Sequence, residues 1–149
     1  MDMSSDEKPG PADCNCHAVR AAARHITQAY DRFLAPSGLR TTQFSILAAL
    51  KRKGPLTINA LAAEMAMDRT TLGRNILPLE RDGLIRIAPT ASDRRAKELH
   101  LTKTGERRFA SACKGWAAAQ ARFERTYGGK RAAELRGLLR AVVASDLAR

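Results

Sequence analysis

The sequence predicts a mainly α-helical fold with one small β-hairpin, and two observations support this fold class. Hydrophobic residues make up 44% of the 149 residues but aromatic residues only 5%, so the core must consist mainly of Ala, Leu, Ile and Val. Such a composition favours helices. Apolar residues recur every three or four positions over most of the chain, whereas alternation is confined to residues 84–102. A chain of this length forms one compact domain or a small subunit.

Two helices separated by a break are predicted in the first third of the chain. The first covers residues 13–35, because apolar side chains return to one face at three- and four-residue steps before the breaker "PSG". The second covers residues 42–53, with Thr42 as its N-cap, and "GP" ends it.

Two short helices follow in tandem. Thr57 is placed to cap a helix that ends near Glu64, and Asp68 is placed to cap a second helix that closes at Gly83. Only the turn "MAM" separates them, and the second helix is polar at its N-terminal end. Two helices joined this tightly are typical of a helix-turn-helix, whose second helix enters the major groove of DNA.

A β-hairpin is predicted directly after these helices. "LIRIAP" and "AKELHLT" alternate apolar and polar residues on either side of the polar tip "TASDRR". The inner pairing is expected to bring Leu84, Ile85 and Ile87 opposite Leu99 and Leu101. A basic hairpin in this place is a wing, so residues 37–102 are predicted to form a winged helix-turn-helix DNA-binding domain.

Thr102 is placed to cap a long helix over residues 103–127, and a last helix follows a Gly-Gly break. The long helix carries a seam suited to packing against another long helix. The seam residues are Phe109, Cys113, Trp116, Gln120, Phe123 and Tyr127. Apolar stripes at both ends of a short chain are expected to be buried in a second subunit. We therefore predict a helical dimerisation region over residues 13–36 and 103–149.

The chain is strongly basic, with a formal net charge of +11 and 19 arginines among its 26 basic residues. This charge indicates a polyanionic partner, and guanidinium groups suit phosphate and guanine edges. No run of about 18 apolar residues is present, so no transmembrane helix is expected. Charge alone does not exclude a membrane surface, but the motifs favour DNA, and no membrane partner is predicted. The start is acidic and contains Pro and Gly, unlike a signal peptide, and residues 1–12 are expected to form a disordered tail. Three cysteines without an export signal are typical of free thiols in the cytoplasm.

Three stretches carry a resemblance to a known family: "GLRTTQFSILAAL", "LAAEMAMDRTTLGRNILPLERDGLI" and "DRRAKELHLTKTGE". Together with the flanking helices they resemble the MarR family of bacterial transcriptional regulators over residues 13–148. The Asp-Arg-Arg tip, followed by Leu-Thr and Gly105, is the most specific part. The resemblance implies a homodimer with interlocked terminal helices, whose two winged helix-turn-helix lobes bind a roughly palindromic operator in double-stranded DNA. It also implies repression as the default mode.

The helix that begins at Asp68 is expected to enter the major groove N-terminus first, with Leu72 and Ile76 turned to the core. Arginine and asparagine can read guanine and adenine edges, and threonine methyls can touch thymine. The polar side chains on its outer face are Arg69, Thr70, Thr71, Arg74 and Asn75. We expect base contacts from Thr70, Thr71 and Arg74, while Arg69 can serve a phosphate instead.

In the wing, Arg94 and Arg95 can enter a narrow minor groove, which attracts guanidinium groups. Arg86 and Lys97 are expected to contact phosphates. The resemblance favours Arg95 and implies that Asp93 orients an arginine through a salt bridge; alternatively, Asp93 is a plain turn residue.

A regulator of this kind responds to an input, and oxidation of Cys16 is one interpretation. Cys16 lies in the first helical turn, one turn before Arg20, and both features favour a thiolate. A cysteine near the start of the first helix, followed fourteen residues later by Tyr30, is similar to the organic-peroxide-sensing branch of the family. Thr41 stands where that branch has a second tyrosine.

Two other interpretations remain open. A metal ion is disfavoured, because Cys14 and Cys16 lie about 200° apart around a helix, although Cys14 with His17 is better placed. Alternatively, Cys16 and Cys113 pack as small hydrophobic residues. A small aromatic or anionic effector would then bind between the dimer helices and the DNA-binding domain. Its candidate lining residues are Arg24, His25, Tyr30 and Trp116.

No metal site and no cofactor are expected, and an enzyme is not predicted. The sequence contains no glycine-rich phosphate loop, no HExxH and no GxSxG motif. A basic dimer that binds DNA without sequence preference, as nucleoid proteins do, is the remaining alternative. A specific regulator differs from it by preferring its operator about a thousandfold or more.

Overall fold

The computed structural model describes residues 8–148, so residues 1–7 of the predicted disordered tail lie outside the described residues. The described part forms six α-helices, three β-strands and two short 3₁₀ turns at Pro11–Asp13 and Ala35–Ser37. The elements are α1 (Asn15–Leu34), α2 (Thr41–Lys53), β1 (Leu56–Thr57), α3 (Ile58–Glu64), α4 (Arg69–Arg81), β2 (Ile85–Pro89), β3 (Lys97–Leu101), α5 (Lys103–Tyr127) and α6 (Gly129–Ala144). The predicted mainly α-helical class with a small wing is confirmed.

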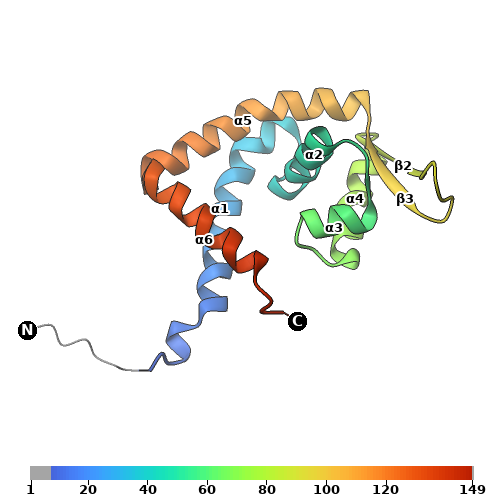
Figure 1. Ribbon diagram of the computed structural model, residues 1–149. Helices are drawn as coiled ribbons and strands as arrows, with labels where there is room; N and C mark the ends of the chain where they lie inside the picture. Colours follow the sequence, from blue (N-terminus) through green and yellow to red (C-terminus); the bar gives the residue numbers. More distant parts are fainter. Residues whose placement is uncertain (1–7, 149) are drawn as a thin grey trace, which may run out of the picture.

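The long helix α5 connects two parts of the molecule (Figure 1). Near its N-terminal end lie α2, α3 and α4, and the hairpin of β2 and β3 projects beyond them as a wing. At the other end α6 folds back from α5, far from the wing. The helix-turn-helix and the terminal helices therefore occupy opposite ends of α5.

The hydrophobic core lies between α2, α3, α4, the sheet and the N-terminal half of α5. Its largest fully buried side chains are Leu34, Ile46, Leu47, Leu61, Leu72, Leu79, Leu84, Ile85 and Leu99. Leu72 and Ile76 of α4 are buried as expected, whereas the neighbouring Leu77 is 63% exposed. Leu77 is one position past Ile76, about 100° away around the helix, so it leaves the buried face.

The predicted caps are confirmed at three helices. The side chain of Thr57 accepts the Ala60 N–H at 3.1 Å, and the side chain of Thr102 accepts the Gly105 N–H at 3.0 Å. Asp68 caps α4 in the same way. The predicted cap at Thr42 is wrong, because α2 begins at Thr41.

The start of α2 is held instead by α1 and by the preceding residue. The Asp31 carboxylate accepts both the N–H and the hydroxyl of Thr41 at 2.7 Å. The Arg40 N–H donates to the side chain of Gln43 at 3.0 Å. The first helix also starts later than predicted, at Asn15 instead of Asp13, because Pro11–Asp13 forms a separate 3₁₀ turn.

The predicted hairpin pairing is confirmed, with Ile85 opposite Leu101 and Ile87 opposite Leu99. The sheet contains one strand more than predicted, because β1 pairs antiparallel with β3 and gives the order β1-β3-β2. Two residues are too few to show alternation, so no sequence pattern could have revealed β1.

The seam of α5 packs within its own chain, first against α2 and farther along against the long helix α1, so the long helix that it was expected to meet belongs to the same chain. The Phe44 ring of α2 lies 5.1 Å from Phe109 and 6.2 Å from Trp116, measured between ring centroids. Farther along, Gln120 meets Tyr30 of α1.

Helix α6 leaves its apolar stripe uncovered, with Leu138, Leu139, Val142 and Val143 exposed and Leu147 beyond the helix 83% exposed. Among the helices of the described chain, none is long and apolar enough to cross a membrane.

Candidate nucleic-acid interface and effector pocket

The N-terminal turn of α4 is held together by its own cap. The Asp68 carboxylate accepts the N–H and the hydroxyl of Thr71, both at 2.8 Å. These hydrogen bonds, the backbone one first, lower the pKa of Asp68. The Asn75 amide donates to the Thr71 carbonyl at 2.8 Å. Thr71 therefore has its methyl free for a base, while its hydroxyl is engaged inside the helix.

Thr70, Arg69 and Arg74 are exposed on α4, and Leu72 and Ile76 are buried behind them, as predicted. Arg74 and Asn75 line a hollow of about 400 Å³ with residues of α1 and α2. Arg40, which was not among the predicted site residues, lies in the same hollow. Its position in "GLRTTQ", directly before a predicted helix, is the sequence feature that could have indicated it.

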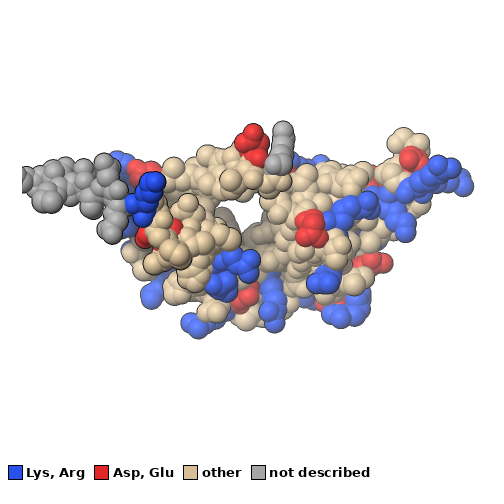
Figure 2. All heavy atoms as spheres, turned by 90° about the horizontal axis from the view of Figure 1, so that it is seen from below, with Lys and Arg blue, Asp and Glu red and all other residues tan. Residues whose placement is uncertain are grey.

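The wing and the helix-turn-helix form one groove of about 560 Å³. Four of the predicted DNA-contact residues line it: Arg69, Asp93, Arg95 and Lys97. The N-terminus of α3 supplies the opposite wall, and Arg86 and Arg94 lie outside the groove on exposed positions of β2 and the tip. Basic side chains gather at the wing end of the molecule (Figure 2). Positive charge thus borders the groove on both sides.

Asp93 shapes the tip of the wing. Its carboxylate accepts the Arg95 N–H at 2.9 Å, and its carbonyl accepts the Thr90 hydroxyl at 2.7 Å. Within residues 8–148 no ion pair joins Asp93 to an arginine, so the expected salt bridge is corrected to a role in the turn. Short carboxylates of this kind bind a backbone N–H two residues on and fix such turns.

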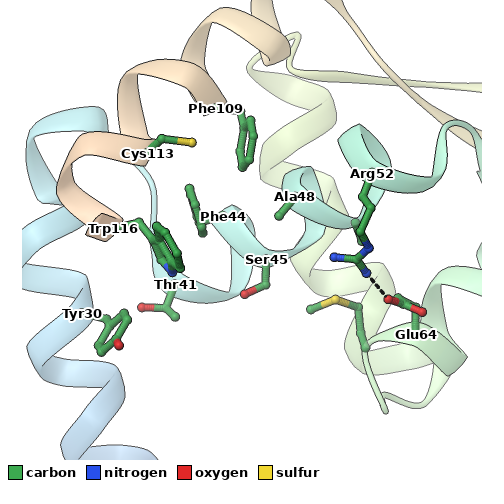
Figure 3. A pocket seen from close by; sticks show the side chains of 12 residues that line it. Tyr30, Thr41, Phe44, Ser45, Ala48, Arg52, Glu64, Phe109, Cys113 and Trp116 are labelled. Atoms are coloured by element: carbon green, nitrogen blue, oxygen red, sulfur yellow. Dashed lines mark hydrogen bonds and ion pairs between the residues drawn. The ribbon is translucent and has the colours of Figure 1, made fainter. Parts of the chain in front are cut away.

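A second site lies between α1, α2, α3 and α5, where a pocket of about 550 Å³ opens (Figure 3). Its walls are mostly aromatic and aliphatic, and both Tyr30 and Trp116 line it. Arg24 and His25, expected to share this site, are exposed on α1 and do not line it. The Cys113 side chain reaches the pocket between Phe109 and Trp116.

Tyr30 joins the pocket to the α1–α5 contact. Its hydroxyl donates to Gln120 Oε1 at 2.5 Å. Burial of the ring, assisted by the negative charge of Glu124, raises the pKa of Tyr30. The phenol therefore stays neutral and keeps its role as a hydrogen-bond donor at physiological pH.

The N-terminal cysteines lie away from both sites. Cys14 and Cys16 are exposed, which corrects the interpretation of Cys16 as a core residue, whereas Cys113 packs partly buried against the core. The Cys14 sulfur caps α1 by accepting the His17 N–H at 3.4 Å. Cys16 and Tyr30 are fourteen residues apart on one helix, or about 21 Å along its axis, so they cannot meet within one chain.

These elements define a class: a winged helix-turn-helix protein of the kind that binds DNA and regulates transcription. A sequence model of the MarR family matches residues 37–96. The uncharacterized HTH-type transcriptional regulator YwoH of Bacillus subtilis is 30% identical over 93 residues, which cover 62% of this chain and 67% of YwoH. The chain belongs to the MarR family of transcriptional regulators, a family of DNA-binding proteins and not of enzymes.

Solved structures agree with this assignment. The transcriptional regulator MosR of M. tuberculosis, solved in complex with DNA, has a TM-score of 0.77 and 39% identity, with 90% of this chain and 99% of MosR covered. The PcaV regulator of Streptomyces coelicolor has a TM-score of 0.81 over 96% of this chain and 99% of its own, at 21% identity. The second likeness concerns the fold alone.

Proposed function

We propose that this protein is a cytoplasmic transcriptional repressor that binds a palindromic operator as a homodimer and leaves it when an effector binds. The observation that carries the proposal is the groove between α4 and the wing, lined by basic residues from both elements. The DNA complex of MosR, which shares 39% of its sequence with this chain, supports the same use of the domain.

Each side chain has an assigned role in this complex. Thr70, Arg74 and the methyl of Thr71 contact bases in the major groove, and Asn75 stands beside them. Phosphates are bound by Arg69, Arg86 and Lys97. Arg94 and Arg95 enter the minor groove, where the turn fixed by Asp93 presents them.

The second subunit covers the apolar stripe of α6 and the exposed apolar side chains Val19 and Phe33 of α1. Both helices lie at the end of α5 opposite the wing, so pairing there leaves two recognition helices free to bind two half-sites (Figure 1). A palindromic operator mirrors the two-fold symmetry of such a dimer.

Selection of genomic fragments by the purified protein, followed by binding assays at fixed salt, tests the DNA-binding role. We expect a preference for the selected palindrome of about a thousandfold over random DNA. Arg95→Ala should weaken operator binding, whereas Lys51→Gln, which removes a charge paired with Glu106 at 3.2 Å, should change it little. Equal effects of the two substitutions, or equal binding to all DNA, would favour the nucleoid-type alternative.

The effector is a small aromatic or anionic compound bound in the pocket of Tyr30 and Trp116. The support is a pocket of about 550 Å³ with aromatic walls, within the range usual for small ligands. Aromatic acids added to the protein–operator complex should release the DNA, and substitution of Tyr30 by Phe should alter the concentration required.

Oxidation of Cys16 is the second candidate for the input, favoured by its exposure in the first turn of α1. Since Tyr30 of the same chain is too far away, any partner for an oxidised Cys16 must come from elsewhere. Operator binding is to be measured before and after peroxide treatment in the wild type and in Cys16→Ser. Release of the wild type alone supports this input, and equal behaviour of both proteins rejects it.

A further inference from the structure

The charged end of the effector pocket carries a further inference, which rests on the proposed effector-binding function. Helix α2 turns one face toward the pocket along its whole length, from Thr41 through Phe44 and Ala48 to Arg52. These positions are three or four residues apart, so they lie in line on the helix. The aromatic rings of Phe44 and Trp116 occupy one end of this line, and Arg52 occupies the other (Figure 3).

Arg52 and Glu64 are the charged members of the pocket wall among the described residues. They form an ion pair that joins α2 to the last residue of α3. Lys53 binds the other oxygen of Glu64 at 2.6 Å. The hydrogen bond from Lys53 first, then the charge of Lys53 and after it that of Arg52, lower the pKa of Glu64, so this carboxylate is ionised at neutral pH.

This arrangement allows Arg52 to exchange its carboxylate partner Glu64 for the carboxylate of a ligand. Its side chain is 62% exposed, so an incoming anion can reach it from solvent. If Arg52 turns to another carboxylate, Glu64 keeps Lys53 as its partner and no buried charge is left alone. Lys53 itself does not line the pocket.

The space between the two ends determines the shape of a ligand. Phe44 and Arg52 are eight residues apart, about 12 Å along the helix axis. Between them the wall is made of the small side chains Ser45, Ala48 and Ala49, which leave room for a chain of atoms. An aromatic ring stacked near Phe44 therefore reaches Arg52 with a carboxylate on a flexible arm more easily than with one attached directly to the ring.

We propose that Arg52 selects the effector, by binding the carboxylate of an elongated aromatic acid in exchange for the carboxylate of Glu64. The arginine expected from the sequence to serve this site, Arg24, does not line the pocket, and Arg52 takes that role.

Trp116 makes the proposal measurable, because it is the only tryptophan of the chain and lines the pocket. Quenching of its fluorescence is to be followed while the full-length protein is titrated with 4-phenylbutyrate and with the neutral 4-phenylbutyramide. The wild type should bind the acid about tenfold more tightly than the amide, the effect of one hydrogen bond to a charged partner. Arg52→Gln should abolish that preference and leave the affinity for the amide unchanged.

Lys53→Gln is the matched control, since it removes the same charge from the same carboxylate partner without touching the pocket wall. It should lower the preference for the acid only in part, because Arg52 still lines the pocket but is then the sole partner of Glu64. Glu64→Gln should tighten acid binding several-fold, because no competing carboxylate then holds Arg52.

Three results would overturn the proposal: quenching by neither compound at millimolar concentration, a preference that survives Arg52→Gln, or an equal loss in Arg52→Gln and Lys53→Gln. Operator release is measured separately with the same acid. Quenching that depends on Arg52 without release of DNA would reject the effector function but support Arg52 as the selecting residue.

Discussion

Gly115 of α5 lies close to the backbone of α1, and replacing it by alanine tests how α1 and α5 are held. A Cβ atom at position 115 would lie 2.4 Å from the Phe33 carbonyl oxygen of α1 and 3.2 Å from its carbonyl carbon. Real Cβ atoms essentially never lie closer than 3.0 Å to a neighbouring heavy atom, and the obstacle is backbone that no rotamer change can clear. Helices α1 and α5 must therefore move apart by at least several tenths of an ångström.

The magnitude follows from two opposing effects. Overpacking a closely fitted contact costs about 1–3 kcal/mol. Alanine in place of glycine inside a helix contributes about 1 kcal/mol in the other direction. Gly115→Ala should therefore destabilise the protein by up to about 2 kcal/mol and lower its Tm by up to about 8 °C, given about 2–4 °C per kcal/mol for a chain of this size.

Gly137 of α6 provides the matched control. A Cβ atom there would meet nothing within 4 Å, so Gly137→Ala keeps the helix gain without the clash. Thermal unfolding followed by circular dichroism compares both variants with the wild type at one protein concentration, because the stability of a dimer depends on concentration. If Gly115→Ala is as stable as Gly137→Ala, the close crossing of α1 and α5 is not what position 115 controls.

Three further predictions concern the DNA-binding domain. Gly73→Ala, where a Cβ atom has open space, should raise Tm but weaken operator binding if the α4 backbone approaches DNA there; unchanged affinity in a stabilised variant would remove Gly73 from the interface. Thr102→Ala removes the α5 cap and a 2.6 Å hydrogen bond to the Gly83 carbonyl, and should cost about 1–2 kcal/mol in urea unfolding. A loss below about 0.5 kcal/mol would contradict that role. Because the pKa values of Asp68 and Glu64 are lowered in the folded state, their contribution to stability is present above the ordinary carboxyl pKa and is lost as the pH falls through the folded values. Urea unfolding between pH 7 and pH 3 should accordingly show a smaller acid loss for Glu64→Gln, and identical pH profiles would refute this assignment.

Local signals in the sequence predicted the elements that depend on neighbouring residues. The caps at Thr57 and Thr102 and the pairing of Ile87 with Leu99 each follow from a short pattern, and each is present. Features that depend on distant contacts were missed or misassigned. The ion pair of Arg52 and Glu64 spans two helices and leaves no mark in either one, because its formation depends on the angle between α2 and α3.

The α5 seam is a second feature whose contacts depend on distant parts of the chain. Its spacing predicted correctly that the stripe packs against something, but spacing cannot identify the partner. Phe44 of α2 and Tyr30 of α1 take positions that an equally periodic helix of a second chain could have taken. The stripe of α6 has the same kind of pattern but is exposed in this chain. The prediction that a partner subunit covers it therefore stands as a prediction.

Helix α2 links the two sites, because one of its faces lines the effector pocket and another, at its N-terminus, meets the recognition helix. Thr41, Phe44 and Arg52 face the effector pocket, whereas Arg40 and Gln43 at its N-terminus share a hollow with Arg74 of the recognition helix. A helix of 13 residues is stiff over this length, so a displacement imposed on its pocket face moves the side chains beside Arg74 as well. The hydrogen bonds from Thr41 to Asp31 fix the same end of α2 to α1. In the proposed function, effector binding therefore reaches the predicted DNA-contacting residues through one rigid element whose N-terminus is tied to α1.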